Sequence, residues 1–465
     1  MKKKLLSVLL STAMVSALLV GCTSTPAEGG EDVATEENGG ASTEEGGEVT
    51  VAEDTGKVLN IYVWNEEFKT RVVEKYPGYV AVDANNGTIG DVAVVWTTVP
   101  SDDNAYQNNL DTVLAQQLAG ELADDDKIDL FLVEADYAMK YTGSEATLAM
   151  SDIGLDDSVF ADQWQYTKDV VTFDGKLKGS SWQGCPGVLI YNRAAAEEVL
   201  GTQEPADVQA FVSDWDKFNE TAATMKANGY QMVSSVNDTY RVYSNNVTSK
   251  WVEDGKINID ANIMKWVDDS KVMVDNGYAG THDLWSDDWS KGFYPQGKVF
   301  CYFGPAWLVN FCMAADVEGS IGNQGGWGAC KGPQGFFWGG TWMCAANGTD
   351  NPNLVADLIK TMTTDAGILK DIVETYDDFT NSQTVMNEMA NSDYASAVFG
   401  GQNPIGMYCE GVKTIDLSNI SNYDQGCNES FQAAMKDYFL GNSTKEEALD
   451  LFYKAVEEKY PGVTH

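Results

Sequence analysis

The sequence predicts an α/β protein made of two lobes. Segments patterned like buried strands alternate with segments whose apolar residues recur at helical spacing, and this alternation is typical of a parallel sheet covered by helices. The pattern starts again after Gly175. From Val58 onward the chain has 408 residues (465 − 57 = 408), which is more than one hydrophobic core usually organises and therefore favours two lobes.

The first half of this region opens with an apolar segment that has the character of a buried strand. Phe68, Val72 and Tyr76 follow it at helical spacing, and a Pro-Gly pair after Tyr76 ends the helix. Two more strands and a leucine-lined helix come next. The expected elements are a strand at 58–64, a helix that ends at 76–78, a strand at 91–99, a helix at 108–124 and a strand at 128–133.

The second half is defined mainly by helix start signals. Ser213 is expected to be an N-cap with Asp216 three residues later, and Pro352 to occupy the first position of a helix. Thr444 and Glu447 have the spacing of a capping box. The expected elements are a strand at 187–191, helices at 194–200, 213–229 and 263–274, a helix from Pro352 and a final helix after Thr444.

The N-terminus has the parts of a bacterial lipoprotein signal. Residues 2–4 are lysines, residues 5–20 are apolar but shorter than the roughly 20 residues of a membrane-spanning helix, and Gly21-Cys22 completes a lipobox. We expect residues 1–21 to be removed and the Cys22 thiol to carry the lipid, because two or more acyl chains anchor a protein stably. This predicts a protein held on the extracellular face of the cell membrane. A plain secreted protein and a short membrane anchor are the alternatives.

Residues 22–57 are expected to form a flexible tether. Between residues 23 and 57 there are ten Asp or Glu residues against one Lys, together with three Gly pairs. Such a composition cannot build a hydrophobic core, and its like charges repel one another. The segment is therefore predicted to be a disordered acidic spacer between the membrane and the folded part.

The composition excludes several classes of function. Apolar residues make up 43% of the chain and aromatic residues 11%, as in a globular protein, and the formal net charge is −40. Nucleic acids and anionic membrane surfaces require basic patches, so neither is an expected partner. His282 and His465 are the two histidines and no C-x-x-C motif occurs, so we expect no metal site and no cofactor.

Seven cysteines follow Cys22, and their pairing cannot be assigned from the sequence. Disulfides are chemically permitted outside the cell. Because seven is an odd number, at least one thiol must stay free within a single chain. The seven residues are Cys185, Cys301, Cys312, Cys330, Cys344, Cys409 and Cys427.

Short motifs in a characteristic order give the chain its strongest resemblance. From residue 58 to residue 462 it resembles the family 1 extracellular solute-binding proteins, which include maltose-binding protein. Residues 79–90 are unusual for that family, and four of the cysteines stand where it commonly has small or apolar residues. The segments that carry the resemblance are 187–193 (GVLIYNR), 213–218 (SDWDKF), 297–300 (GKVF), 304–307 (GPAW), 326–328 (GWG) and 339–342 (GGTW).

The resemblance implies a periplasmic-binding-protein-like fold, in which two α/β lobes are joined by hinge strands and enclose a cleft. It also implies a monomeric binding protein that delivers a sugar to the permease subunits of an ABC importer. The implied N-terminal lobe comprises residues 58–180 and 342–380, and the C-terminal lobe comprises 184–338 and 384–465. The implied crossings lie near 178–184, 338–342 and 379–384.

The candidate ligand-binding residues lie at predicted strand ends and at these crossings. In open α/β sheets ligands bind beyond the carboxyl ends of the strands. Indole rings can cover the apolar faces of a sugar, while carboxylates and amides can hold its hydroxyl groups. The candidates are Trp64, Asn65, Glu66, Glu134, Asp136, Trp182, Gln183, Trp307, Trp338, Trp342 and Gln383.

Other interpretations of these residues and of the chain stay open. Each Trp can be a core residue, and Asn65, Glu66, Glu134 and Asp136 can be helix caps or hinge residues. The ligand can be a peptide or a polyamine, and the fold can serve an adhesin or a sensor that has no permease. An exported glycoside hydrolase or lyase would need two carboxylates at a defined separation. The two histidine positions argue against a Ser-His-Asp or Cys-His site.

Overall fold

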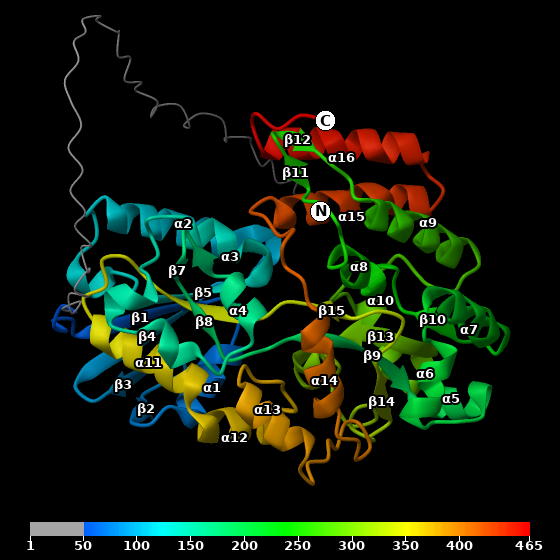
Figure 1. Ribbon diagram of the computed structural model, residues 1–465, viewed down its shortest axis with the longest axis horizontal. Helices are drawn as coiled ribbons and strands as arrows, with labels where there is room; N and C mark the ends of the chain where they lie inside the picture. Colours follow the sequence, from blue (N-terminus) through cyan, green and yellow to red (C-terminus); the bar gives the residue numbers. More distant parts are fainter. Residues whose placement is uncertain (1–50) are drawn as a thin grey trace, which may run out of the picture. The chain divides into compact units, whose positions relative to one another are not determined.

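The computed structural model describes residues 51–465, which belong to one compact unit. The predicted signal peptide at 1–21, the lipidation of Cys22 and most of the predicted tether lie outside the described residues. Two separate sheets organise the unit, one in the left half of Figure 1 and one in the right half. We call the part built on each sheet the first and the second lobe.

The first lobe is built on a seven-stranded sheet with the order β2-β3-β4-β1-β5-β16-β8. Its centre is parallel, because β1 pairs in parallel with both β4 and β5, and β16 then pairs antiparallel with β5. Leu59, Ile61 and Val63 are fully buried. The strands are β1 (Val58–Val63), β2 (Tyr79–Ala81), β3 (Asn86–Ile89), β4 (Val92–Thr98), β5 (Leu130–Glu134), β8 (Ser180–Ser181) and β16 (Thr341–Ala345).

The second lobe is built on a sheet with the order β10-β13-β9-β14, to which β15 adds by pairing with β9. Every residue of β9 and β13 is buried, so both strands are covered on the two faces of the sheet. Its strands are β9 (Pro186–Asn192), β10 (Gln231–Val233), β13 (Val299–Gly304), β14 (Trp327–Cys330) and β15 (Phe336–Phe337).

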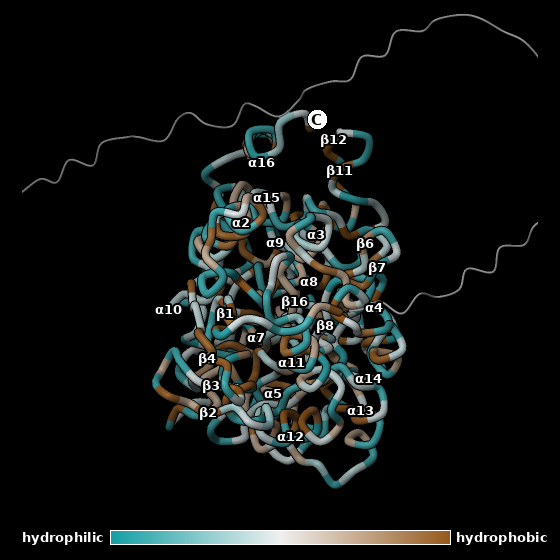
Figure 2. The backbone as a smooth tube through the Cα atoms, turned by 90° about the vertical axis from the view of Figure 1, so that its left-hand side faces the viewer, coloured by the Kyte–Doolittle hydropathy of each residue, from teal (hydrophilic) through white to brown (hydrophobic). Residues whose placement is uncertain are grey.

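Helices cover both sheets and close the ends of the unit. Figure 2 shows α16 at one end and α12 at the other. The longer helices are α1 (Glu67–Lys75), α2 (Ala105–Leu118), α3 (Ala135–Thr142), α5 (Arg193–Leu200), α7 (Trp215–Ala227), α8 (Asn237–Ser244), α9 (Ala261–Asp275), α11 (Pro352–Thr364), α12 (Ala366–Tyr376), α13 (Gln383–Ala390), α15 (Asp424–Phe439) and α16 (Lys445–Lys459).

The chain passes between the two sheets at a small number of places. It leaves the first sheet after β8 and enters the second at β9, and it returns between β15 and β16. Near these passages Gln183 forms an isolated antiparallel bridge with Thr380. These positions fall at or beside the expected crossings, whereas the residue ranges assigned to each lobe stay a prediction.

Several local expectations are confirmed and others are wrong. Pro352 occupies the first position of α11, and the Thr444–Glu447 capping box forms at the start of α16. The N-cap of α7 is Asp214 and not Ser213, because the Asp214 carboxylate accepts from the Lys217 backbone N–H. The unusual segment after residue 78 is a hairpin of β2 and β3 that adds to the edge of the sheet, and no strand was expected there.

The end of the predicted tether is held in place. Thr55 donates its backbone N–H to the Asp350 carbonyl, and the Asp54 carboxylate accepts from the backbone N–H groups of Asn353 and Leu354. Those two groups are the unpaired donors of the first turn of α11, whose own N-cap residue makes no side-chain cap bond. The prediction of a free tether up to residue 57 is therefore wrong for its last residues, because a helix terminus needs an acceptor.

Replacing Asp54 with alanine is expected to lower the free energy of unfolding by about 1 kcal/mol, since this is the usual cost of losing a helix cap. Glu53 is the matched control, because it is also acidic and exposed and stands next to Asp54. Urea unfolding of the two alanine variants measures the difference. Equal stability of both variants would show that Asp54 does not cap α11.

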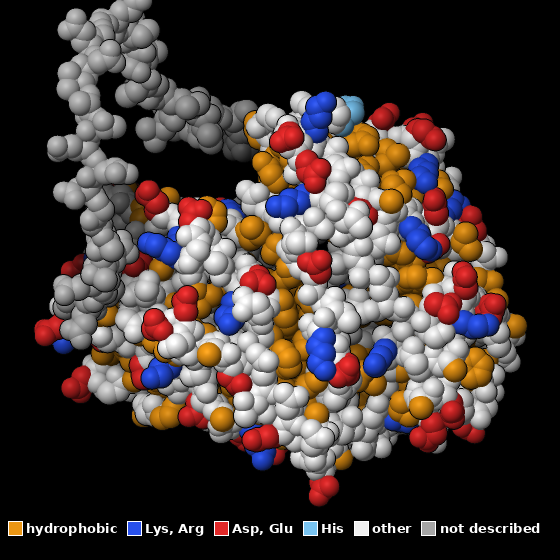
Figure 3. All heavy atoms as spheres, in the orientation of Figure 1, with side chains coloured by type: hydrophobic (Ala, Val, Ile, Leu, Met, Phe, Trp, Pro, Cys, Tyr) orange, Lys and Arg blue, Asp and Glu red, His pale blue; other side chains and the backbone are white. Residues whose placement is uncertain are grey.

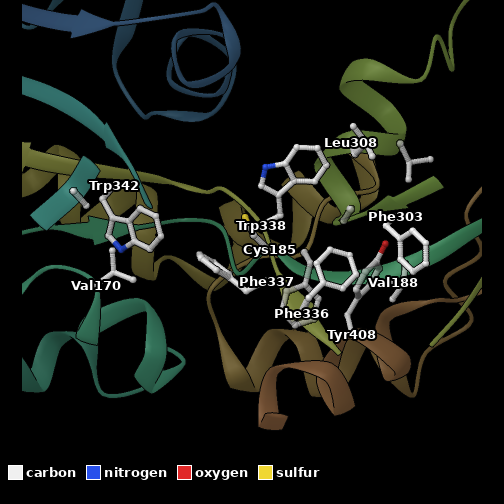
Figure 4. Close-up of a cluster of buried hydrophobic side chains, with 14 of the residues drawn as sticks. Val170, Cys185, Val188, Phe303, Leu308, Phe336, Phe337, Trp338, Trp342 and Tyr408 are labelled. Atoms are coloured by element: carbon white, nitrogen blue, oxygen red, sulfur yellow. The ribbon is translucent and has the colours of Figure 1, made fainter. Parts of the chain in front are cut away.

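The seven described cysteines are all free thiols, and six of them are buried. Burial raises the pKa of Cys344, Cys185 and Cys301 well above the ordinary value, so these thiols stay protonated at neutral pH. They therefore act as small apolar core residues. Figure 4 shows Cys185 next to Trp338 in the packed region between the two sheets.

Candidate functional site

A large cavity lies where elements of the two lobes face each other. It encloses about 1650 Å³ including its open mouth, whereas typical small-molecule pockets have about 300–1,000 Å³. Its lining comes from the segments after β1 and β5 and the start of α2 in the first lobe, and from α8, α15 and the loops around residues 285 and 307 in the second. Residues 338–340, between β15 and β16, and Thr341, the first residue of β16, complete it.

Three tryptophans form a continuous aromatic wall in this cavity. The ring centroids of Trp307 and Trp338 are 5.4 Å apart, those of Trp285 and Trp338 are 5.7 Å apart, and those of Trp285 and Trp307 are 6.3 Å apart. Trp285 is 55% exposed although it is a large apolar side chain. Exposed indole at a concave surface is typical of a ligand contact. We call these three residues the indole wall.

A fourth tryptophan lines the first-lobe part of the cavity. Trp64 follows β1 and packs edge-on against Tyr106 and Tyr137, with ring centroids 5.6 and 6.4 Å apart. It is half-buried, so part of its ring stays open to the cavity. Indoles from both lobes therefore line one space.

Glu134 is the last residue of β5 and the N-cap of α3. Its carboxylate accepts the Asp136 backbone N–H at 2.8 Å. The side chain lies next to the indole wall, because a Cβ atom added to Gly339 would be 3.2 Å from Trp307 and 3.6 Å from Glu134 Oε1. Burial raises the pKa of Glu134 to about 8, and the nearby negative charge of Asp136 adds to this effect.

An ion pair joins the lobes beside Glu134. The Arg241 guanidinium on α8 donates to both carboxylate oxygens of Asp136 on α3, with a distance of 2.7 Å from Nη1 to Oδ1. Both side chains are about four-fifths buried, with exposed fractions of 19% and 20%. A second bond between the lobes runs from Gln425 on α15 to Asn104, at 3.1 Å. The lobes are therefore held together across the cavity by polar contacts.

Two buried polar groups along the cavity have no partner among the described residues. Tyr137 is 6% exposed and Gln107 is 5% exposed, yet the Tyr137 hydroxyl and the Gln107 Oε1 make no hydrogen bond there. An unpaired buried polar group is costly and needs an explanation. A polar ligand in the cavity would supply the missing partners.

The structure brings together seven of the eleven candidate residues. Gln183 is buried, and its Nε2 donates to Glu67 Oε1 at 2.9 Å, while the Asn65 side-chain Oδ1 accepts the Glu67 backbone N–H at 3.0 Å. Both residues therefore have structural bonds in addition to a place on the cavity. The residues that line it are Trp64, Asn65, Glu134, Asp136, Gln183, Trp307 and Trp338.

The other four candidates lie away from the cavity. Trp182 is fully buried and stacks on Phe68, and Trp342 is buried and donates its indole N–H to the Thr167 carbonyl. Figure 4 shows Trp342 next to Val170, inside the core. Glu66 is on the surface in an ion pair with Lys69, and Gln383 lines a separate pocket, where its amide donates to the Gln163 carbonyl.

Sequence reasoning missed several lining residues. Trp285 stands in an acidic loop that the sequence showed to be rich in Asp and Trp, and this was the one usable signal. Arg241 and Tyr137 lie within helices, where no pattern distinguishes a cavity position from an ordinary surface or core position. The additional lining side chains include Glu67, Asp102, Asn104, Gln107, Tyr137, Asn237, Tyr240, Arg241, Trp285, Phe311, Gln425, Glu429 and Gln432.

Residues 51–465 contain neither a metal-binding cluster nor a helix suited to a membrane. No group of three or more His, Cys, Asp or Glu side chains in this range is arranged to hold a metal ion. None of the helices described there has both the length and the apolar character needed to cross a bilayer.

A family model described as bacterial extracellular solute-binding protein matches residues 80–398, more than half of the chain. The chain belongs to this family. The resemblance inferred from the short motifs is thereby confirmed. No curated protein sequence matches this solute-binding protein.

Solved structures show the same fold. A structure of an extracellular solute-binding protein of family 1 has a TM-score of 0.67 and 17% identity over 86% of this chain and 99% of its own. A transporter-associated binding protein from Bifidobacterium animalis subsp. lactis, in complex with β-1,6-galactobiose, has a TM-score of 0.65 and 17% identity over 87% and 98%. The lacto-N-biose-binding protein of an ABC transporter from Bifidobacterium longum has a TM-score of 0.63 and 16% identity over 87% and 97%.

These matches confirm the predicted two-lobed α/β fold of the periplasmic-binding-protein type. The likeness covers nearly the whole length of the solved chains, so both lobes of this solute-binding protein are accounted for. At 16–17% identity it establishes the fold alone, and the ligand has to be argued from the cavity of this chain.

Proposed function

We propose that this solute-binding protein binds a sugar or an oligosaccharide in the cavity between its lobes and delivers it unchanged to the permease of an ABC importer. The observation that carries the proposal is the indole wall, because flat aromatic faces cover the apolar face of a sugar ring. Glu134 lies beside this wall, and the unpaired groups of Tyr137 and Gln107 line the same cavity, where they can act as partners for hydroxyl groups. The sugars bound by solved relatives support the same ligand class.

The cavity favours binding over hydrolysis. A glycoside hydrolase needs a second carboxylate that is free to act as base or nucleophile. Asp136, the acidic neighbour of Glu134, has both oxygens bonded to Arg241. A hinged pair of lobes instead offers closure around a ligand, since contacts made only in the closed form stabilise it. A closed, loaded form is what a permease could distinguish from the empty protein.

The lipid anchor at Cys22 belongs to the same proposal. A thiol that follows an apolar segment and a glycine suits lipidation. Attachment to the membrane would keep the protein close to the permease and raise its effective concentration there. A surface adhesin or sensor would share the fold and the anchor. Uptake of the bound sugar by cells separates the two, because an adhesin does not support uptake.

Tryptophan fluorescence during titration with a panel of mono- and oligosaccharides tests the binding. Trp285→Ala and Trp307→Ala are each expected to weaken the affinity for the sugar that binds about three- to tenfold, which corresponds to one aromatic contact. Trp215→Ala is the matched control, because Trp215 is half-buried in the second lobe and stacks on Tyr243 outside the cavity. Unchanged affinity in both cavity variants would remove the indole wall from the binding site.

A further inference from the structure

The carboxylates that line the cavity differ in whether they have a positive partner. Glu134 is half-buried, and it forms no ion pair within residues 51–465, because no Lys, Arg or His nitrogen there lies within 4.0 Å of its carboxylate oxygens. Asp102 is exposed to solvent. The remaining carboxylates are engaged: Asp136 with Arg241, Glu429 with Lys459 at 3.2 Å, and Glu67 with Gln183 and with Arg71 at 3.7 Å.

Arg241 is the one basic side chain among the described residues that line the cavity, and it is fully engaged by Asp136. An acidic sugar would therefore find no free cation in the cavity to pair with its carboxylate. A positively charged group would instead meet the Glu134 carboxyl group, because the nearby Arg241 guanidinium is bonded to Asp136 and lowers the pKa of Glu134 less than burial and Asp136 raise it. In this partly desolvated place a charge-assisted hydrogen bond to the ionised form is strong.

The neighbours of Glu134 favour a sugar as the carrier of that charge. The carboxylate and the Trp307 ring flank the same glycine, Gly339, so a ring that lies on the indole wall would have its edge beside Glu134. Burial raises the pKa of Glu134 to about 8, and an adjacent cation would favour the ionised form again. The unpaired Tyr137 hydroxyl and Gln107 Oε1 can bond further hydroxyl groups of the same ligand.

We propose that the ligand is an amino sugar, with its ring on the indole wall and its protonated amino group on the carboxylate of Glu134. This inference rests on the proposed function and narrows it to one class of sugar. It makes Glu134 the residue that selects for charge, and it assigns no bond-making or bond-breaking step to the cavity.

Titration calorimetry of the full chain at pH 7 tests the inference with matched pairs of sugars. Glucosamine, galactosamine, mannosamine and the β-1,4-linked glucosamine disaccharide are compared with their hydroxyl counterparts, namely glucose, galactose, mannose and cellobiose. Glucuronate and galacturonate complete the series. We expect at least one amino sugar to bind tenfold or more tightly than its hydroxyl counterpart. We expect the two uronates to bind more weakly than both sugars of that pair.

The Glu134→Gln variant tests the role of the carboxylate. It keeps an oxygen that can accept the Asp136 backbone N–H, so α3 stays capped, and it is expected to remove the preference for the amino sugar. The control is Glu410→Gln, which changes an exposed carboxylate outside the cavity and is expected to change the ratio of the two affinities by less than threefold.

The outcomes separate the two proposals. If hydroxyl sugars bind as tightly as the amino sugars in every pair, or if Glu134→Gln keeps the preference, the inference is overturned and sugar binding itself stands. If neither this series nor the wider sugar panel contains a ligand, the proposed function fails and the inference fails with it.

Discussion

Arg241→Met is expected to lower the free energy of unfolding by about 2–4 kcal/mol, one of the two largest effects that this structure predicts. The substitution leaves Asp136 mostly buried without a counter-ion, beside the carboxylate of Glu134. It also removes one of the polar contacts that join α3 of the first lobe to α8 of the second. Urea unfolding measures the loss.

A double-mutant cycle separates the ion pair from other consequences of the substitution. Asp136→Asn combined with Arg241→Met removes both charges, so the double variant should lose clearly less than the sum of the two single variants. The control is Lys217→Met, which breaks an exposed ion pair with Glu220 and should cost less than about 0.5 kcal/mol. Additive losses in the cycle would mean that the pair does not couple the lobes.

The second large effect is a dependence of stability on pH. The free energy of unfolding is expected to fall as the pH rises from 5 to 8. Asp238 on α8 is buried and accepts from the Trp289 indole N–H at 2.6 Å and from the Ser235 backbone N–H at 2.8 Å. Burial raises its pKa from 3.8 to about 7, against the lowering effect of these hydrogen bonds. Burial also raises the pKa of Glu67 to about 7.

The sign of the effect follows from proton binding. Between pH 4 and pH 7 the folded protein holds the Asp238 proton and the unfolded chain has released it, so each increase in pH favours the unfolded chain. The stabilisation is complete below the unfolded pKa and is lost as the pH passes the folded pKa. For Asp238 alone, the free energy of unfolding is expected to be about 2–3 kcal/mol lower at pH 8 than at pH 5.

Urea unfolding at pH 5, 6, 7 and 8 measures this dependence. Asp238→Asn carries no proton to lose, so its stability should fall much less over the same range. Glu220→Gln is the control, because this exposed carboxylate should leave the slope as it is. A stability that is flat or rises between pH 5 and pH 8, or an unchanged slope in Asp238→Asn, would contradict the assignment.

The fold could be predicted well where local signals are strong. The buried run of β1, the proline that opens α11 and the capping box of α16 each specify one element, independent of the rest of the chain. The β2–β3 hairpin could not be predicted in this way, because its short strands are mostly half-buried or exposed at a sheet edge and lack a hydrophobic pattern.

The candidate site was predictable only in part, for a physical reason. The carboxyl ends of β1 and β5 must face the same edge of a parallel sheet, which placed Trp64 and Glu134 correctly on the cavity. Trp182 has the same chemistry as Trp307, yet it is covered by Phe68 of α1. Which indole is covered depends on the packing of distant elements, and this information is not local in the sequence.

The overall charge of the protein could be predicted from the sequence, but the pairing of the charged groups at the cavity could not. The acidic composition predicted a protein without affinity for polyanions. Figure 3 shows Asp and Glu side chains spread over the visible face and interspersed with Lys and Arg. For the proposed ligand the important acidic group is Glu134, and only the three-dimensional structure shows that Arg241, the basic side chain on the cavity, is bonded to Asp136 instead.

A crystal structure of the full chain with the tightest-binding sugar tests the central claim most directly. The expected result is one intact sugar between the lobes, with a ring face on Trp307 or Trp338 and a polar group bonded to Glu134. A sugar bound elsewhere on the surface, or one found cleaved in the cavity, would contradict it.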